Sequence, residues 1–436
     1  MGSYIPNSIS ERAEMLQAIG LETVDELFAQ IPDELKRSAL PYKGMSELEV
    51  SRYINSLADK NIRFKTIFRG AGAYNHYIPS IVRSITSKEE FLTAYTPYQA
   101  EISQGVLQSI FEFQTMICNL TGMDASNASV YDGATAAAEA VAMCVERKKT
   151  KMLVSATANM MTIRTMQTYC YASGATIEII PADNNGQTDI ASLRKALDDT
   201  VAGLYIQSPN YYGIIEDATA LGEIIHQAGG KFVMGVNPIS LGIIKTPAEC
   251  GADIAVGDGQ PLGMPLSFGG PYLGFMTSTA AMQRKLPGRI VGETTDVDGK
   301  RAFVLTLQAR EQHIRREKAS SNICSNQALC AMTAAVYMAA MGPAGIRDVA
   351  SQCLSKAHYA AEKFGAVKGF NIRYKSDFFN EFVTECPVEA NEILTKLEHE
   401  SILGGYPVEN NGILWCITEM NTKAEIDRTA LVISGR

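Results

Sequence analysis

The feature that most constrains this chain is an alternation of short apolar runs with helical patterns between residues 151 and 276. The strand-like runs span residues 151–156, 176–182, 202–208, 231–236, 253–259 and 272–278. Helical patterns, such as those at 157–173 and 217–230, separate several of these runs. Strands that alternate with helices predict a mainly parallel sheet with helices on both faces, so the predicted fold class is α/β. In such sheets, ligands bind at the carboxyl ends of the strands.

Helical patterns precede the predicted sheet. Capping-box spacings begin at Ser8, Thr23 and Ser46. They predict a helical arm of short helices over residues 1–66. Apolar residues from Ile102 to Leu120 recur in steps of three and four, which predicts a further helix. The stretch 129–147 is typical of a turn that opens onto an alanine-rich helix.

The C-terminal part predicts a long helix and then a small α+β domain. An apolar pattern over 323–341 predicts a helix that Ser321 or Asn322 caps, and the sequence GPAG at 342–345 would end it. Strand-like and helix-like pieces follow to the C-terminus. The predicted parts are a helical arm, a large α/β domain, a linking helix and a small C-terminal domain. Their predicted bounds are 1–66, 67–322, 323–345 and 346–436.

Composition excludes several functional classes. A net charge of −8 argues against a nucleic-acid partner, which requires a basic face. No run approaches the ~20 apolar residues of a membrane span, and the N-terminus lacks a signal-peptide pattern. The nine cysteines are scattered without a Cys-x-x-Cys, and none of the five histidines has metal-ligand spacing. We therefore expect reduced thiols, a cytoplasmic location and no metal site.

Five stretches of the chain resemble one known family. They span residues 4–20, 70–82, 91–105, 110–140 and 310–331. These stretches resemble the P-protein of the glycine cleavage system, the pyridoxal-phosphate (PLP) dependent glycine decarboxylase. The likeness runs to about Gly345 and is to the N-terminal half, called subunit 1 or the α-subunit. It departs at Ala100, where the family commonly has proline. The resemblance implies a fold-type I PLP-dependent transferase fold, like that of aspartate aminotransferase.

Two groups that PLP chemistry requires are missing from their expected places. In the loop 257–275, the position of the imine-forming lysine holds Gln260, and no lysine occurs between Lys245 and Lys285. We interpret Gln260 as an ordinary polar loop residue. The strand 231–236, which should end in a carboxylate facing the pyridine nitrogen, is followed by Asn237. We therefore expect this chain to hold no PLP covalently.

The turn at Asp132-Gly133-Ala134-Thr135 allows two interpretations. Free backbone N–H groups at the start of a helix can bind a phosphate. The same residues equally form an ordinary helix N-terminus, which the absence of a nearby lysine favours.

The resemblance implies that loops of this chain complete the active site of a partner. Tyr95, Thr96, Tyr98 and Gln99 lie on a loop before a helix, where they could contact a small amino acid or pack an interface. Tyr74 and His76 lie beside glycines and could line the same site, although a lone histidine is more often structural.

A charged stretch before the predicted linking helix supplies further candidates. Arg315, Arg316 and Lys318 could contact the partner's PLP phosphate or an acidic lipoyl carrier, or could simply form a solvated loop. Ser321 and Asn322 are candidate ligands as well as helix caps.

The resemblance implies a reaction as well as a site. In the family, glycine is decarboxylated on PLP and its aminomethyl group passes to the lipoyl arm of H-protein. This chain would act with a PLP-bearing subunit 2, as an α2β2 assembly, and would be inactive alone. Two alternatives remain: a structural or regulatory scaffold for the PLP-bearing subunit, and a self-sufficient PLP enzyme with a lysine elsewhere.

Overall fold

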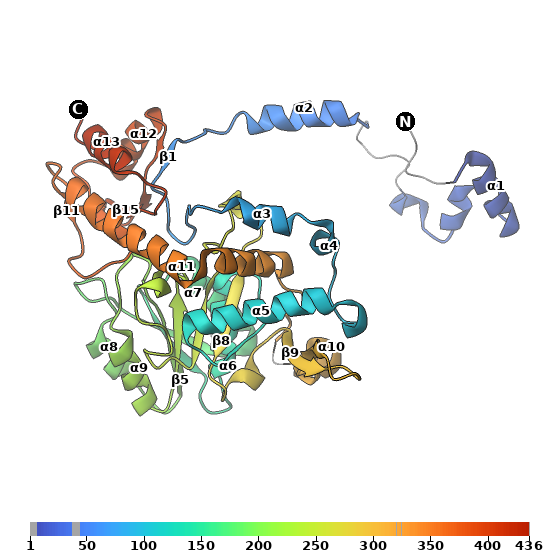
Figure 1. The fold of residues 1–436 in the computed structure, drawn as a ribbon, viewed down its shortest axis with the longest axis horizontal. Coiled ribbons are helices and arrows are strands. Elements are labelled where there is room, and N and C mark those ends of the chain that lie inside the picture. The colour runs from blue at the N-terminus through green and yellow to red at the C-terminus, as the bar shows by residue number, and fades with distance from the viewer. Residues whose placement is uncertain (1–6, 37–43, 320, 324, 436) are drawn as a thin grey trace. The chain divides into compact units, whose positions relative to one another are not determined.

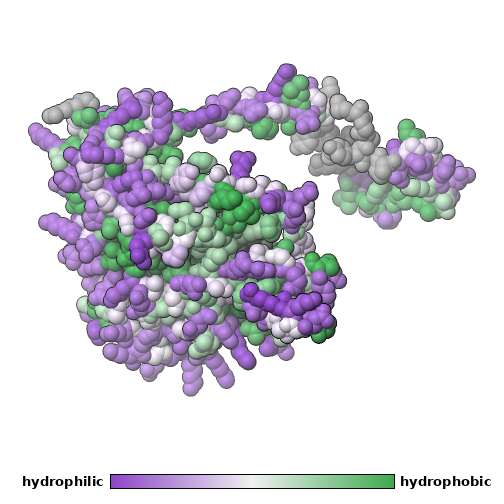
Figure 2. All heavy atoms as spheres, viewed as in Figure 1, coloured by the Kyte–Doolittle hydropathy of each residue, from purple (hydrophilic) through white to green (hydrophobic). Residues whose placement is uncertain are grey.

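The computed structural model describes residues 7–36, 44–319, 321–323 and 325–435. The chain divides into two compact units, Met1–Ile62 and Arg63–Arg436. Unit 1 contains helices α1 (Ile9–Ala18) and α2 (Glu47–Ala58) and two short 3-10 helices, η1 (Val24–Phe28) and η2 (Asp33–Leu35). The capping boxes at Ser8 and Ser46 are confirmed, because each hydroxyl accepts from the backbone N–H three residues on. None of its described residues is buried, and apolar side chains reach the surface along α1 and α2 (Figure 2).

A seven-stranded sheet forms the centre of unit 2 (Figure 1). Its strands are β2 (Ala125–Ser126), β3 (Lys151–Ser155), β4 (Thr176–Ile180), β5 (Val201–Gln207), β6 (Lys231–Val236), β7 (Ile254–Asp258) and β8 (Gly274–Ser278). The order is β2-β8-β7-β6-β5-β3-β4. The five strands from β7 to β4 run parallel, and β8 pairs antiparallel with both β7 and β2. The predicted α/β class is confirmed.

Helices cover both faces of this sheet because neighbouring strand residues point in opposite directions. Met152 of β3 packs into a core with helices α6 (Gly133–Cys144) and α7 (Met160–Ser173). Leu153, the next residue, packs into the core on the other face. The helices of that second core are α3 (Ser80–Thr86), α5 (Gln104–Thr121), α8 (Ile190–Ala196), α9 (Ala218–Gln227) and α11 (Ala328–Gly365).

The C-terminal part forms a second, antiparallel sheet. Its order is β11 (Asn371–Ile372), β12 (Glu381–Glu385), β15 (Gly412–Cys416) and β14 (Tyr406–Val408). Helices α12 (Ala390–His399) and α13 (Lys423–Ile433) accompany it, and Trp415 is fully buried in its core. The short strand β1 (Thr66–Ile67) pairs in parallel with β13 (Ile402–Leu403), which brings an early segment beside this sheet.

Helix α11 differs from its prediction at both ends. It begins at Ala328, so neither Ser321 nor Asn322 caps it, and residues 321–327 precede it without regular structure where described. The GPAG sequence does not end it: Gly342 has a φ of +61°, which glycine tolerates, and the helix resumes at a kink. Buried residues on both sides of the kink, such as Tyr337 and Cys353, pack against the core and hold the two halves in one element.

Two further features of unit 2 were not predicted. Strands β9 (Ile290–Thr295) and β10 (Arg301–Thr306) form an antiparallel hairpin before the charged stretch. Helix α11 also passes the length and apolarity test for crossing a membrane, although no span was expected. Of its most apolar window, 39% is buried inside the protein, and one such helix is weak evidence for a membrane span.

Candidate functional site at the strand ends

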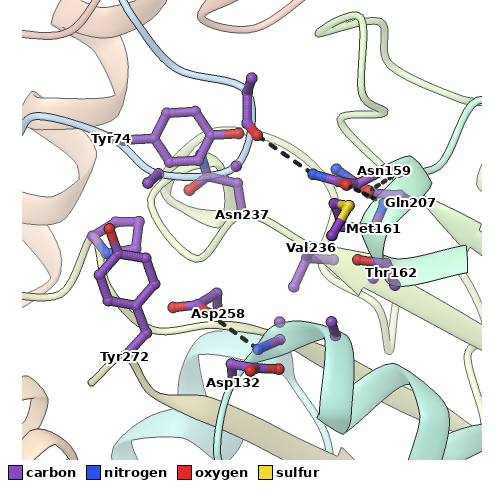
Figure 3. A pocket seen from close by; sticks show the side chains of 18 of the residues that line it. Tyr74, Asp132, Asn159, Met161, Thr162, Gln207, Val236, Asn237, Asp258 and Tyr272 are labelled. Carbon is purple, nitrogen blue, oxygen red and sulfur yellow. Dashed lines mark hydrogen bonds between the residues drawn. The ribbon is translucent and has the colours of Figure 1, made fainter. Parts of the chain in front are cut away.

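A pocket of about 360 Å³ lies at the carboxyl ends of the central strands (Figure 3). The ends of β5, β6 and β7 form its floor, and the N-terminal turn of α6 and the start of α7 form two walls. Residues 70–74 close it from the side of the C-terminal sheet. This is the place where a parallel sheet predicts a ligand, and we call it the strand-end pocket.

The chain's own carboxylates bind the helix terminus in this pocket. Asp258 Oδ2 accepts a hydrogen bond from Gly133 N at 3.0 Å, and Asp132 Oδ1 accepts from Thr135 N at 2.7 Å. A side chain at position 133 would collide with Asp258, since an added Cβ would lie 2.9 Å from its backbone nitrogen. The turn at 132–135 is therefore an internally capped helix N-terminus, as the second interpretation of the sequence has it.

Asp258 makes this end of the pocket electronegative. Burial is the main cause that raises the pKa of Asp258 to about 6, and the charge of Asp132 acts in the same direction. Hydrogen bonds from backbone N–H groups, such as that of Gln260, act in the opposite direction. At neutral pH the carboxylate is mainly ionised. A phosphate at the same helix terminus would have to displace it or lie against it.

Gln260 is a buried structural residue and not the ordinary polar loop residue that we expected. It is 1% exposed. Its Nε2 donates to the carbonyl oxygens of Tyr74, at 2.9 Å, and Met264, at 2.8 Å. Its Oε1 accepts from Tyr74 N at 2.9 Å. The amide therefore holds the segment around Tyr74 against the loop that follows β7.

The remaining PLP requirement is also unmet. Asn237 follows β6, and its Oδ1 accepts from Ile239 N at 3.0 Å. Its Nδ2 is buried without a partner among the described residues. The pocket lining contains no lysine, arginine or histidine. The residues of this pocket therefore do not fit PLP, because they offer neither an imine-forming amine nor a cation for the phosphate.

Tyr74 points at a carboxylate that the sequence did not single out. Its hydroxyl donates to Glu381 Oε2 at 2.9 Å, and Ala71 N donates to Glu381 Oε1 at 2.7 Å. Burial raises the pKa of Glu381 to about 7. Glu381 begins β12 of the C-terminal sheet, so it ties the pocket wall to a strand some 300 residues away. No local pattern could reveal such a contact.

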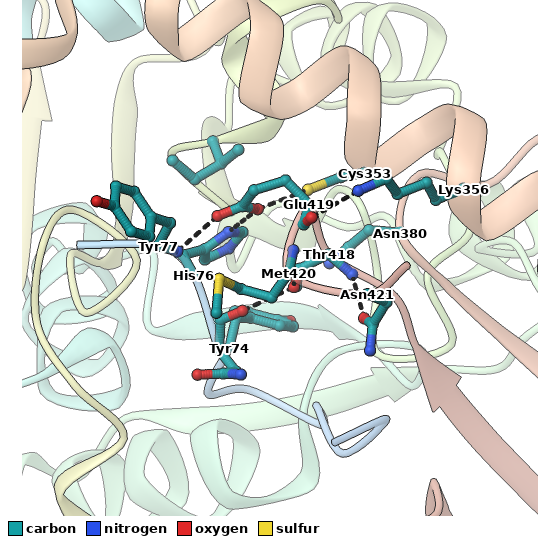
Figure 4. Close-up of polar contacts among 12 residues, drawn as sticks. Tyr74, His76, Tyr77, Cys353, Lys356, Asn380, Thr418, Glu419, Met420 and Asn421 are labelled. Carbon is teal, nitrogen blue, oxygen red and sulfur yellow. Dashed lines mark hydrogen bonds and ion pairs between the residues drawn. The ribbon is translucent and has the colours of Figure 1, made fainter. Parts of the chain in front are cut away.

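His76 does not line the strand-end pocket but is buried beside Glu419 (Figure 4). Its Nδ1 lies 2.8 Å from Glu419 Oε2, and Tyr77 N donates to Oε1 at 2.6 Å. Cys353 Sγ lies 3.5 Å from the same carboxylate. Ligand atoms of His76, Cys353 and Glu419 lie within 4.8 Å of one another, a grouping that sequence spacing did not predict. The contacts of Glu419 with His76 and with Cys353 join three separate segments.

The tyrosine loop is exposed, as its prediction requires. It lies between α4 (Glu89–Leu92) and a short 3-10 helix, η3 (Ala100–Ile102), that precedes α5. Tyr95 is 87% exposed and Tyr98 is 53% exposed. Thr96 is half-buried and Gln99 is exposed.

Arg289 is buried and contacts this loop, and the half-buried Arg310 bonds to the residue beside it; neither arginine was predicted from the sequence. Arg289 Nη2 donates to the Tyr98 hydroxyl at 3.0 Å, and its guanidinium carbon lies 5.3 Å from the ring centre. Arg310 donates to the carbonyl of Gly288 at 2.6 Å. The Nε atoms of both arginines are buried without partners in the described chain. The loop therefore rests on positive charge.

The candidate ligand residues of the charged stretch do not all lie in one place. Arg315, Arg316 and Lys318 are exposed on α10 (Gln312–Arg315) and on the 3-10 helix η8 (Arg316–Lys318). Arg315 Nε donates to the Ala309 carbonyl at 3.2 Å. Asn322 is exposed and shares a shallow surface cavity with Arg316. Ser321 instead turns inward and binds a buried carboxylate on α6.

A mainly parallel seven-stranded sheet, helices on both faces and a smaller C-terminal sheet define the fold of the fold-type I PLP-dependent enzymes. Two solved structures share it. One is a sphingosine-1-phosphate lyase from Burkholderia pseudomallei, with a TM-score of 0.68 and 14% identity over 92% of each chain, which supports the fold alone. The other is a crystal structure of glycine decarboxylase (P-protein) of the glycine cleavage system in inhibitor-bound form, with a TM-score of 0.95 and 38% identity over 100% of each chain.

Sequence comparisons narrow this class to one family. The family model of the glycine cleavage system P-protein matches residues 2–433. A relative from Desulforamulus reducens, named "Probable glycine dehydrogenase (decarboxylating) subunit 1", is 49% identical over 439 residues, 98% of each chain. A relative of the same name from Moorella thermoacetica is 47% identical over 443 residues, 99% of each chain. The chain belongs to the glycine cleavage system P-protein family and is similar along its length to subunit 1, which confirms the resemblance.

Proposed function

We propose that this chain is the subunit of a heteromeric glycine decarboxylase that carries no PLP of its own. The observation that supports this most directly is the strand-end pocket. Gln260 occupies the lysine position as a buried hydrogen-bonded amide, and Asp258 occupies the helix terminus that would receive a phosphate. The partner, a lysine-bearing subunit 2, holds the PLP.

The overall reaction belongs to the complex. With its partner, the chain decarboxylates glycine and the aminomethyl group passes to the lipoyl group of H-protein. PLP, when bound by the partner, would supply the electron sink that decarboxylation requires. The residues of this chain help to bind and orient the substrate, and they exclude water from the shared active site. The assembly is an α2β2 heterotetramer in the cytoplasm, and the isolated chain is inactive.

The tyrosine loop and the charges beneath it are the parts proposed to meet the partner's site. Tyr95 and Tyr98 present hydroxyls at the surface, and Arg289 supports Tyr98 from below. Glycine is a small zwitterion and PLP carries a phosphate, so a phenol over a buried guanidinium group suits their negative groups. Thr96 and Gln99 flank these tyrosines, and Arg316, Lys318 and Asn322 offer a second exposed set for the cofactor phosphate or for H-protein.

A scaffold role suits two of the other candidates better. Tyr74 is 9% exposed and His76 is 7% exposed, and both direct their polar atoms at carboxylates within this chain. We therefore propose that these two residues position the pocket wall and do not touch the partner's substrate.

An absorbance experiment tests the proposed function. The purified chain is incubated with PLP, washed and treated with borohydride, alone and after co-expression with a lysine-bearing second subunit. We expect no imine band from the chain alone. With the partner, we expect a band that maps to the partner and glycine-dependent release of CO2. A reducible imine on one lysine of the isolated chain would instead make it a self-sufficient PLP enzyme.

A further inference from the structure

A second cavity, of about 520 Å³, lies between helices α6 and α7. It shares no lining residue with the strand-end pocket. Its walls are mostly apolar and come from α6, α7 and residues 321–323. Three of its lining side chains carry the argument: Glu139, Tyr131 and Tyr169. We call this cavity the Glu139 pocket.

Glu139 is a buried acid without a counter-ion. It is 4% exposed, and its one hydrogen bond in the described chain comes from the Ser321 hydroxyl to Oε1, at 3.0 Å. The other carboxylate oxygen has no partner among the described residues, and the pocket lining contains no lysine, arginine or histidine. Burial raises the pKa of Glu139 to about 7. A buried carboxylate normally requires a pairing charge, and the described residues of the pocket lining supply none.

Two phenol rings accompany this carboxylate. Tyr131 precedes α6 and Tyr169 lies on α7. Both line the same cavity as Glu139. Burial raises the pKa of Tyr169 to about 12, and the charges of Glu139, Tyr131 and Asp132 act in the same direction. The faces of tyrosine rings attract organic cations, and a carboxylate beside them adds charge pairing.

We propose that the Glu139 pocket binds the ammonium or guanidinium group of an organic cation, with Glu139 as its counter-ion and Tyr131 and Tyr169 as its walls. The alkyl stem of the cation lies along apolar wall residues such as Val141 and Ala142. The cation is either a free small amine or a lysine or arginine side chain of another subunit. The free-cation site is independent of the proposed function, because its binding is measured on this chain alone.

Calorimetric titration of the full chain tests the site. The probes are n-butylammonium chloride and n-propylguanidinium chloride, at constant ionic strength. We expect saturable binding at a single site. Glu139→Gln keeps the size of the side chain and the bond from Ser321 but removes the charge, so it should weaken binding about tenfold or more. Glu223→Gln, which makes the same charge change at an exposed position on α9, should leave binding unchanged.

Further variants show whether a loss of binding comes from the pocket itself or from a folding defect. Tyr169→Phe keeps the ring and should retain binding, whereas Tyr169→Leu should weaken it. Thermal unfolding of each variant without probe confirms that it is folded, and the probes should raise the melting temperature of the wild type more than that of Glu139→Gln. Absence of saturable binding to the wild type, or equal binding to Glu139→Gln, would overturn the site.

Co-purification with the lysine-bearing subunit shows whether the cation in the Glu139 pocket is a side chain of that subunit or a free small amine. If a partner side chain fills the pocket, Glu139→Gln should weaken subunit association and n-butylammonium should compete with it. If a small amine fills the pocket, association should be unchanged and the complex should still bind the probe. This arm rests on the proposed function, and its failure would leave the titration of the isolated chain unaffected.

Discussion

Glu381 illustrates how a single residue decides the shape of the strand-end pocket. Its buried carboxylate accepts hydrogen bonds from Ala71 N and from the Tyr74 hydroxyl, at opposite ends of the pocket wall. Gly70 must be a glycine there, because an added Cβ would lie 2.3 Å from Glu381 Oε1. Burial disfavours the ionised form of Glu381 in the folded state, because it raises the pKa of this carboxyl group to about 7.

We expect Glu381 to make stability depend on pH. Its folded pKa of about 7 lies above the ordinary value of 4.5, so the folded state binds the proton more tightly. Stability from this group should therefore rise as pH falls from about 8 to about 5 and then level off. Glu381→Gln should be more stable than wild type at about pH 8, by roughly 3 kcal/mol, and the difference should shrink near pH 5.

Urea unfolding at several pH values measures this effect. Glu223→Gln serves as the control, because Glu223 is exposed and should leave the pH profile of the unfolding free energy unchanged. Parallel profiles for wild type and Glu381→Gln would show that Glu381 does not titrate in this range.

At the scale of elements, the regular strands were predictable and the exceptions have physical reasons. The six strand-like runs between residues 151 and 276 all became strands, because buried parallel strands are continuous apolar runs. The start of α11 was displaced to Ala328, although the apolar pattern begins at Ile323. Ile323 packs in the core on the α6 and α7 face of the central sheet. This tertiary contact holds Ile323 outside α11, which begins at Ala328.

The tyrosine loop supports a prediction at the same scale. In the assembled complex, Tyr95→Ala should lower the turnover of glycine by about tenfold or more while subunit association survives, because an exposed phenol contributes little to the fold of its own chain. His76→Ala should instead destabilise the chain, because Glu419 Oε2 would lose its ring-nitrogen partner and the space of the buried ring would be left empty. Turnover, association and thermal unfolding are measured on each variant. Full turnover of an assembled Tyr95→Ala complex would favour the scaffold alternative.

At the scale of the whole molecule, the two units have different roles in stability. The four apolar cores of the described chain consist of residues from Arg63–Arg436, and none includes a described residue of unit 1. Unit 1 keeps large apolar side chains exposed, among them Ile9 at 80%, Ile19 at 62% and Leu48 at 59%. Exposed apolar surface of this kind is typical of an interaction site.

We therefore expect deletion of residues 1–62 to separate folding from assembly. The remaining chain should unfold at nearly the same temperature as the full chain, because its cores are complete. Its association with the lysine-bearing subunit should weaken markedly. Thermal unfolding and analytical ultracentrifugation of the mixed subunits measure the two effects. Normal association of the shortened chain, or a large loss of its stability, would contradict this assignment.

The sequence by itself determined the order of strands and helices, the family and the absence of a lysine at position 260. These depend on local patterns: apolar periodicity, turn residues and the identity of single side chains. Only the tertiary structure decided what Gln260 and Asp258 do, that Glu381 and Glu419 hold Tyr74 and His76, and that Glu139 lies without a counter-ion in a pocket. Each of these is a contact between segments far apart in the chain, and its energy depends on burial, which no local pattern records.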